Sequence, residues 1–166
     1  MDPIFLRRDV RKYSKKSVPK ENIIQLLKAA MAAPSAEDER PWHFIVINDD
    51  KTKNQISKMH STFYIVAQSP SIIVICGDES LQKVHGFWVQ DCSAATENAI
   101  IEAQYLGLGA VWLGIYPIKG RIQTIRQFLN IPTNIIPFSL LTIGYPVENK
   151  TLINYFDMSR VHFGNW

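Results

Sequence analysis

The stretch Asp91–Tyr116, DCSAATENAIIEAQYLGLGAVWLGIY, decides the fold because it joins the strongest helix of the sequence to a strand. Small residues recur at every fourth position: Ala95, Ala99 and Ala103. Their side chains share one face of a helix over Val89–Leu106 and let other elements approach closely, which predicts a helix at the centre of the molecule. Gly107 fits the C-cap, and the Gly-flanked apolar run Gly109–Tyr116 predicts a strand.

The rest of the chain supplies further elements of both kinds. We expect a short helix from Asp2-Pro3 to about Arg8, a helix from Pro19 to the residue before Pro34, a strand His43–Asn48, a polar helix Asp49–Thr62, a buried strand Ser71–Gly77, a helix Gly120–Asn130, a strand Phe138–Gly144 and an irregular tail Tyr145–Trp166. Four strands and five helices that do not strictly alternate predict an α+β or α/β sheet covered by helices. We expect residues 1–166 to form one domain.

The composition is that of a soluble globular protein, with 46% hydrophobic and 20% charged residues. Cys76 and Cys92 form no metal-binding or redox spacing, which favours a reducing, cytoplasmic location. We expect neither a signal peptide nor a membrane span. The net charge is only +3, but seven Lys and Arg lie between Arg7 and Lys20 against one acid. This pattern leaves open an anionic ligand or no specific partner, and it does not favour nucleic acid.

Several common catalytic motifs are missing from the sequence. It contains no Walker loop, no GxGxxG, no GxSxG and no histidine-rich metal motif, so we expect no metal site. The four histidines are scattered, which favours surface or packed side chains over ligands. If the protein is an enzyme, a cofactor therefore carries the chemistry.

Two segments have residues suited to binding. Arg7-Arg8-Asp9-Val10-Arg11 offers guanidinium groups for a phosphate monoester, or is simply a solvated helix end. Ala32–Ile47, AAPSAEDERPWHFIVI, runs from a helix into a strand through two prolines, four charges and a tryptophan. It is either a loop that lines a site or a connector whose Trp42 fills the core.

Four blocks, in this order, resemble the nitroreductase family of flavoproteins. They are RRDVRKY at the N-terminus, APSAEDERPWHFIVI, the opening stretch Asp91–Tyr116, and IGYPVE followed by FDMSRVHFGNW. The resemblance covers nearly the whole chain. It implies a three-layer α/β/α sandwich with a central, mostly antiparallel sheet, an intertwined homodimer, and one FMN per subunit at the dimer interface.

The resemblance also implies the residues of the flavin site. Arg7, Arg8, Asp9 and Arg11 match the block that holds the phosphate and ribityl chain, with Lys150 or Arg160 completing the phosphate site. Pro34, Ser35, Ala36 and Asp38 would come from the other subunit and lie along the flavin, while Leu113 and Gly114 would offer backbone groups near the isoalloxazine. No catalytic side chain is implied.

Four residues depart from the family pattern. Asp9 replaces Ser, Asp38 replaces Asn, Arg40 replaces Gln, and Tyr155 stands where many members have Arg. A carboxylate beside a phosphate is repulsive unless neighbouring arginines neutralise it.

The resemblance predicts an FMN-dependent NAD(P)H oxidoreductase. Hydride from NADH or NADPH would pass through flavin N5 to a nitroaromatic, a quinone or a similar small-molecule acceptor in a ping-pong scheme. One alternative is a flavin-binding storage or redox-sensing protein, and another is a basic interaction module that only keeps the fold.

Overall fold

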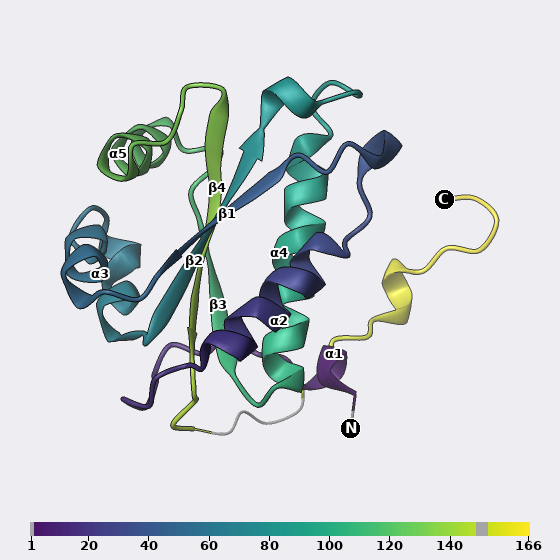
Figure 1. Cartoon of the computed structure of the whole chain (residues 1–166). Helices are drawn as coiled ribbons and strands as arrows, with labels where there is room; N and C mark the ends of the chain where they lie inside the picture. The colour runs from purple at the N-terminus through teal and green to yellow at the C-terminus, as the bar shows by residue number, and fades with distance from the viewer. Residues whose placement is uncertain (1, 149–152) are drawn as a thin grey trace.

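A computed structural model describes residues 2–148 and 153–166. Its sheet consists of β1 (Trp42–Ile47), β2 (Ser71–Asp78), β3 (Gly109–Gly114) and β4 (Ile135–Gly144). The strands lie in the order β1-β2-β4-β3 and every neighbouring pair is antiparallel (Figure 1). All four predicted strands are therefore confirmed, in an antiparallel sheet.

Helices cover both faces of the sheet. Figure 1 shows α2 (Lys20–Met31) and α4 (Trp88–Tyr105) on one side, and α3 (Asp50–Ser57) and α5 (Lys119–Leu129) on the other. A short α1 (Pro3–Leu6) lies near the C-terminal end of α4. The predicted α+β class and the α/β/α layering are both confirmed.

The central strand β2 explains why the sheet holds two separate cores. All eight of its residues are buried, and successive side chains point to opposite faces. Ile73 and Ile75 pack with the small residues of α4, while Ile72 and Val74 pack with Ile56 of α3. The small-residue face of α4 is buried as predicted: Ala95, Ala99 and Ala103 are all in the core.

Two boundaries differ from the sequence prediction by three residues or more, while α1 ends at Leu6 and β3 at Gly114, each about two residues early. The helix expected over Asp49–Thr62 ends at Ser57, and a 3₁₀ helix, Ser61–Gln68, follows it. The ring of His60 accepts a hydrogen bond from the amide of Thr62 and caps this second helix, so that the apolar residues after it reach the core. Strand β4 begins at Ile135, three residues before the prediction, because Pro137 sits at a register shift where the sheet tolerates proline.

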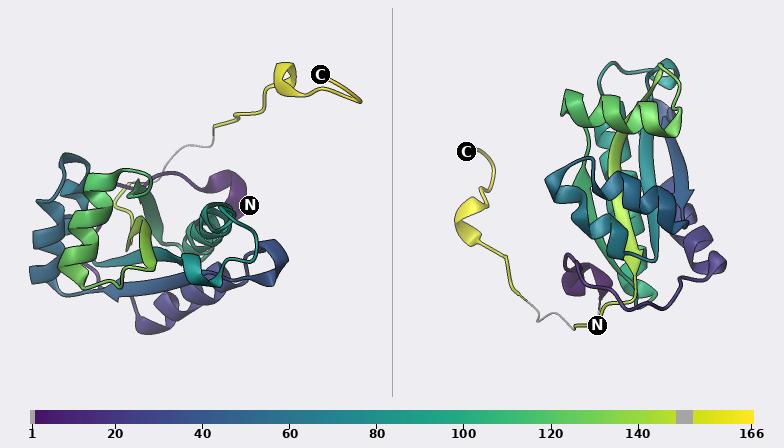
Figure 2. Two further views of the ribbon diagram at one scale, coloured as in Figure 1. Left: turned by 90° about the horizontal axis from the view of Figure 1, so that it is seen from above. Right: turned by 90° about the vertical axis from the view of Figure 1, so that its left-hand side faces the viewer.

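The C-terminal tail, residues 153–166, does not pack on the body. Figure 2 shows it extending away from the sandwich in both views, and each of its residues is exposed. It is irregular as predicted, apart from a 3₁₀ turn at Met158–Arg160. The two cysteines, by contrast, are both buried in the body and unpaired.

Candidate functional site

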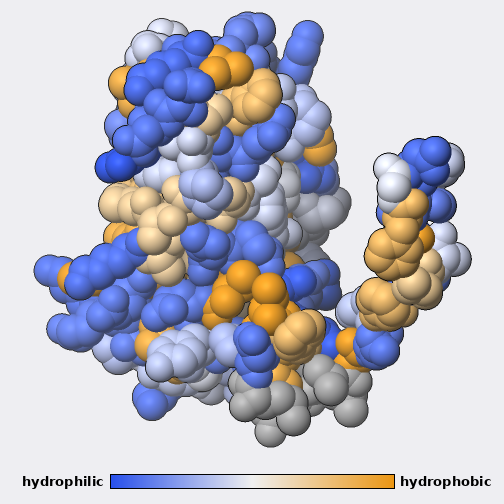
Figure 3. Space-filling view, turned by 90° about the vertical axis from the view of Figure 1, so that its right-hand side faces the viewer, coloured by the Kyte–Doolittle hydropathy of each residue, from blue (hydrophilic) through white to orange (hydrophobic). Residues whose placement is uncertain are grey.

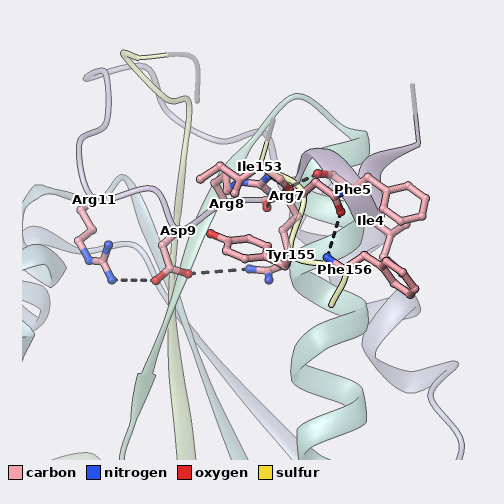
Figure 4. Close-up of a pocket in the computed structure, with 10 residues that line it drawn as sticks. Ile4, Phe5, Arg7, Arg8, Asp9, Arg11, Ile153, Tyr155 and Phe156 are labelled. Carbon is pink, nitrogen blue, oxygen red and sulfur yellow. Dashed lines mark hydrogen bonds and ion pairs between the residues drawn. The ribbon is translucent and has the colours of Figure 1, made fainter. Parts of the chain in front are cut away.

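A cavity of about 710 Å³ lies between the N-terminal segment and the start of the tail (Figure 4). It is lined by Ile4, Phe5, Arg7, Arg8, Asp9, Arg11, Ile153, Asn154, Tyr155 and Phe156. Figure 3 shows the tail standing clear of the body with apolar side chains along it. The size is that of an ordinary ligand site, and the lining brings together all four residues predicted at the N-terminal block.

Arg8 ties α1 to the tail. Its guanidinium donates to the carbonyls of Phe5 (3.1 Å), Arg7 (2.6 Å) and Ile153 (3.0 Å), and it lies 5.5 Å from the centre of the Tyr155 ring. Its Nε is buried without a hydrogen-bond partner. Most of the donors of this arginine are therefore committed to backbone carbonyls and not to the open cavity.

Arg7 and Arg11 flank Asp9 in the same cavity. Asp9 accepts a hydrogen bond from Arg11 at 2.7 Å, and Arg7 Nη1 lies 3.9 Å from its other oxygen. Arg7 Nε also lies 3.0 Å from Glu97 of α4, where burial raises the pKa of Glu97 and Arg7 opposes that rise. The neighbouring arginines thus neutralise the carboxylate that departs from the family pattern.

Close packing fixes this basic segment to the edge strand β3. The Val10 amide donates to the Ala110 carbonyl (2.9 Å). A Cβ added at Gly109 would lie 2.5 Å from the Val10 side chain, so only glycine lets the two segments approach this closely.

A second cavity, of about 320 Å³, contains the predicted Leu113 and Gly114. It is lined by Arg11, Thr62, Tyr64, Ile65, Trp112, Leu113, Gly114 and Arg121. Arg11 lines both cavities, so they adjoin at its side chain. The structure thus places two of the predicted groups, the N-terminal arginine block and the Leu113–Gly114 pair, in neighbouring cavities.

Sequence reasoning missed Arg121, which lies on α5. Its Nη1 donates to the Gly114 carbonyl at 2.6 Å, and its Nη2 lies 3.1 Å from Nε2 of His60. Its guanidinium also lies 5.5 Å from the centre of the Phe63 ring. No signal in the sequence marks it, because a single arginine on an amphipathic helix is most often a solvated residue.

The loop residues that were predicted to lie along the flavin are in a different part of the structure. Pro34, Ser35, Ala36 and Asp38 line neither cavity. The Ala36 amide donates to Asp91 in the first turn of α4, whereas α1, which ends just before Arg7, lies toward the other end of that helix (Figure 1). One chain therefore does not bring the loop to its own arginine cavity.

The loop Ser35–Arg40 is strained and locally bonded. Three non-glycine residues have positive φ: Glu37 (47°), Asp38 (54°) and Arg40 (44°). Each costs roughly 1–2 kcal/mol in this region. The Arg40 amide donates to Ser35 Oγ (3.1 Å), and the Arg40 guanidinium forms two hydrogen bonds to the Asp38 carboxylate (2.6 and 2.9 Å).

Trp42, which follows the loop, belongs to the core. It is 8% exposed and packs with α2 and α4, as the connector interpretation predicted for this side chain. The backbone beside it is fixed as well, because the Pro41 carbonyl accepts from the Asp78 amide at 2.7 Å.

The two residues expected to complete the phosphate site are not in the cavity as described. Lys150 lies outside the described residues. Arg160 lies on the tail, 3.1 Å from Asp157, and does not line the cavity of its own chain.

Three of the four departures from the family pattern contact an arginine, and the fourth is Arg40. Asp9 pairs with Arg11, Asp38 with Arg40, and Tyr155 contacts Arg8. Two of the departures, Asp38 and Arg40, are therefore partners of each other and compensate locally. None of the four disturbs the fold.

Within residues 2–148 and 153–166, no three His, Cys, Asp or Glu side chains are placed to hold a metal ion. In the same part of the chain, no helix has the length and hydropathy needed to cross a membrane.

The model of the nitroreductase family matches residues 4–71 and 57–145. A protein of Methanothermobacter thermautotrophicus, provisionally named NADH dehydrogenase/NAD(P)H nitroreductase, is 46% identical over the whole chain and 87% of its own length. An FMN-dependent nitroreductase of Clostridium difficile has a solved structure with a TM-score of 0.91, at 30% identity and 99% coverage of both chains. The iodotyrosine deiodinase of Thermotoga neapolitana is 39% identical, with 87% of each chain covered. The chain therefore belongs to the nitroreductase family, and it is an NAD(P)H oxidoreductase that by family depends on FMN.

Proposed function

We propose that the protein binds one FMN per subunit across the two adjoining cavities and transfers electrons from NADH or NADPH to an electrophilic small molecule. FMN, when bound, would supply the redox chemistry that links the nicotinamide to a nitroaromatic, a quinone or a similar acceptor. The observation that carries the proposal is the position of Arg11, which lines both the arginine cavity and the cavity of Leu113 and Gly114.

The charges of the larger cavity suit the phosphate end of the cofactor. Three arginines and one aspartate line it, so its side chains carry a net charge of +2. Arginine forks bind phosphate oxygens through paired, charge-assisted hydrogen bonds. Arg7 and Arg11 would reach the phosphate, while Arg8, already bonded to three carbonyls, would hold α1 and the tail around it.

The smaller cavity suits the ring end. Tyr64 and Trp112 offer flat faces, Leu113 and Gly114 offer backbone groups, and no acidic side chain is among the lining residues. Arg121 would hold the carbonyl of Gly114 and add positive charge beside the ring. Neither cavity is lined by a histidine, which agrees with the proposal that no side chain acts as a general acid or base.

A second copy of the chain would complete the site. We propose a homodimer in which Pro34, Ser35, Ala36 and Asp38 of one subunit lie along the flavin held by the arginines of the other. The separation of this loop from the arginine cavity supports the proposal. The exposed apolar tail supports it independently, because it offers a large surface that its own chain does not cover. Lys150 or Arg160 would then complete the phosphate site.

Several kinds of electron acceptor are compatible with the proposed function. The relatives include an FMN-dependent nitroreductase, an FMN reductase of Bacillus subtilis and an iodotyrosine deiodinase. A protein that stores flavin or senses redox state without such turnover is the second candidate, and the involvement of Arg8 with Tyr155 and three carbonyls favours it. No nucleic-acid or membrane partner is proposed.

Anaerobic titration of the flavin-loaded protein with NADH and with NADPH separates these candidates. Bleaching of the flavin absorbance, followed by recovery with an acceptor, is expected of the oxidoreductase. A flavin that neither nicotinamide reduces would favour storage or sensing, and a protein that takes up no FMN would refute both.

Arg11→Ala tests the phosphate end. We expect its affinity for FMN to fall roughly ten- to hundredfold while riboflavin is little affected, since a charged hydrogen bond contributes about 1.5–3 kcal/mol. Lys15→Ala is the matched control, because Lys15 is an exposed cation of the same segment that lines neither cavity. Equal losses for FMN and riboflavin would mean that Arg11 does not bind the phosphate.

A further inference from the structure

Two buried carboxyl groups meet beneath the loop Ser35–Arg40. Glu39 belongs to the loop and is 6% exposed, and Asp91 belongs to the first turn of α4 and is 4% exposed. Ionised side chains are seldom buried this deeply without a counter-charge. The arrangement of their hydrogen bonds shows how the two groups coexist.

One oxygen of each carboxyl group accepts hydrogen bonds from backbone amides. Glu39 Oε2 accepts from the amides of Lys83 (2.7 Å) and Val84 (3.1 Å), and Asp91 Oδ1 accepts from the amide of Ala36 (3.0 Å). Together these bonds join the loop, the segment before α4, and α4 itself.

The second oxygen of each carboxyl group has no donor of its own. Glu39 Oε1 and Asp91 Oδ2 are buried, and neither accepts a hydrogen from another described group. The two side chains are nevertheless close enough for each to act on the pKa of the other as a hydrogen-bonding partner. Two carboxylates hold only acceptors, so a hydrogen bond between them requires one of them to carry a proton.

We propose that Glu39 and Asp91 share a single proton and that this carboxyl–carboxylate pair positions the loop Ser35–Arg40 against α4. Both are positioning residues, since neither lines a candidate flavin cavity. The pair holds the strained loop in the conformation in which, on the proposed function, it would meet the flavin of the partner. That last step rests on the proposed function, whereas the shared proton does not.

The proton resides on Asp91. Burial raises the pKa of Asp91 to about 6, the contact with Glu39 adds to the rise, and the Ala36 amide opposes it. Burial alone would also raise the pKa of Glu39, but the hydrogen bonds from the Lys83 and Val84 amides outweigh it and lower that pKa. Asp91 therefore donates through Oδ2 to an ionised Glu39.

The other charged groups near the pair do not supply the missing hydrogen. Lys83 is the cation that acts on Glu39, and its Nζ donates to the Glu37 carbonyl at 2.7 Å. Asp38 and Arg40 of the loop pair with each other.

The remaining neighbours are similarly committed. Asp78, at the end of β2, pairs with His43 on β1, and its oxygen accepts from Ser80 and Asn134. Cys92, next to Asp91 on α4, and Cys76 on β2 are buried thiols whose pKa values are raised by burial, so both stay neutral.

The pair is effective over a limited pH window. Since the pKa of Asp91 is raised on folding, its contribution to stability is fully present below its ordinary value of 3.8 and is lost as the pH rises from there through about 6. Since the pKa of Glu39 is lowered, its contribution is present above its ordinary value of 4.5 and is lost at lower pH. In the folded protein the pair therefore holds one proton between about pH 4.5 and pH 6, and above this range two like charges meet beneath the loop.

Asp91→Asn tests the proposal directly. The asparagine amide donates to Glu39 Oε1 without a proton that can be lost, while its carbonyl still accepts from Ala36. We expect the carboxylic-acid band in the infrared spectrum of the wild-type protein at pH 5 to be absent from Asp91→Asn. We also expect the fall in unfolding temperature between pH 4 and pH 6, the range between the unfolded and folded pKa values of Asp91, to be smaller in this variant than in the wild type.

The flavin-loaded protein tests the link to the site. The affinity of the wild-type protein for FMN, relative to that of Asp91→Asn, should fall between pH 6 and pH 8 by up to tenfold for each pH unit. The titration of the FMN phosphate changes the affinities of both proteins equally, so it does not alter their ratio. A constant ratio together with the infrared and unfolding results would retain the shared proton but refute its role in flavin binding.

Two further variants keep the test decisive. Glu39→Gln also places an amide donor between the groups, so it should remove the same pH dependence even if Asp91→Asn folds poorly. Asp49→Asn is the matched control, because Asp49 also accepts from a backbone amide (Thr52, 2.8 Å) but is exposed. If Asp91→Asn and Glu39→Gln keep both the infrared band and the wild-type pH dependence, no proton is shared.

Discussion

The loop Ser35–Arg40 and the tail 153–166 are both exposed segments, yet they are held in opposite ways. The loop has three residues in the left-handed region, and polar contacts with α4, Lys83 and its own side chains fix it in place. The tail is rich in apolar side chains, and its contacts with the body pass through Arg8. The comparison teaches that the chain holds the loop through its own contacts, whereas it leaves the apolar side chains of the tail uncovered.

The apolar surface of the tail is large enough to drive an association. Its exposed large hydrophobic residues are Ile153, Tyr155, Phe156, Met158, Val161, Phe163 and Trp166. Burial of one large apolar side chain contributes about 1.5–3 kcal/mol. All seven packed on a second copy would offset much of the roughly 1–2 kcal/mol per residue that ordering the tail costs.

Removal of residues 153–166 should have the largest effect. We expect the shortened protein to be monomeric and to lose FMN, because the surface proposed to join the subunits and one wall of the arginine cavity are gone. Light scattering coupled to gel filtration and the flavin absorbance of the same fractions measure both effects. Removal of Asn165 and Trp166 alone is a milder control, and a flavin-loaded dimer without the tail would contradict the proposed role.

Gly77→Ala should have an intermediate effect, because it disturbs the support of the loop. An added Cβ would lie 2.3 Å from the ring of Trp88, which starts the helix that carries Asp91. We expect a loss of about 1–3 kcal/mol in the free energy of unfolding, measured by denaturant titration. Gly120→Ala is the control. A Cβ added at Gly120 of α5 would have no other atom within 4 Å, so this substitution should stabilise the protein by about 0.5–1 kcal/mol.

Glu37→Gly should have the smallest effect, and of opposite sign. Glycine adopts a φ of 47° without the steric cost of a side chain, so we expect a gain of up to about 1 kcal/mol in the free energy of unfolding. Glu37→Ala retains the strain and should show no gain. If both variants behave alike, the loop is not strained as described.

The sequence predicted most of the fold, because its elements have strong local patterns. The small residues of α4 and the β-branched run of β2 mark buried elements wherever they occur. The early start of β4 was missed because a proline such as Pro137 normally argues against a strand. The sheet accepts Pro137 because it lies at a register shift, which only the structure reveals. The sequence prediction ran α3 on past His60. It missed the separate 3₁₀ helix that begins there, because one ring nitrogen of His60 caps that helix.

The candidate site was predictable only where its residues are close in sequence. Arg7, Arg8 and Arg11 form one block, and the resemblance to the family indicated their chemistry. The contact of Arg121 with Gly114 depends on where α5 packs, and Glu39 and Asp91 come from segments far apart in the chain. Such contacts arise from tertiary packing, so no spacing in the sequence reveals them.

The burial of both thiols gives the protein a built-in reporter of its own opening. Cys92 of α4 packs in the core between α4 and the sheet, whereas the Cys76 side chain of β2 packs in the core on the opposite face, which α3 and α5 cover. Burial raises the pKa of Cys76 to about 12, so in the folded protein it is neither ionised nor accessible to a thiol reagent. The two labelling rates therefore report separately on the opening of the two faces, with no need for an introduced cysteine.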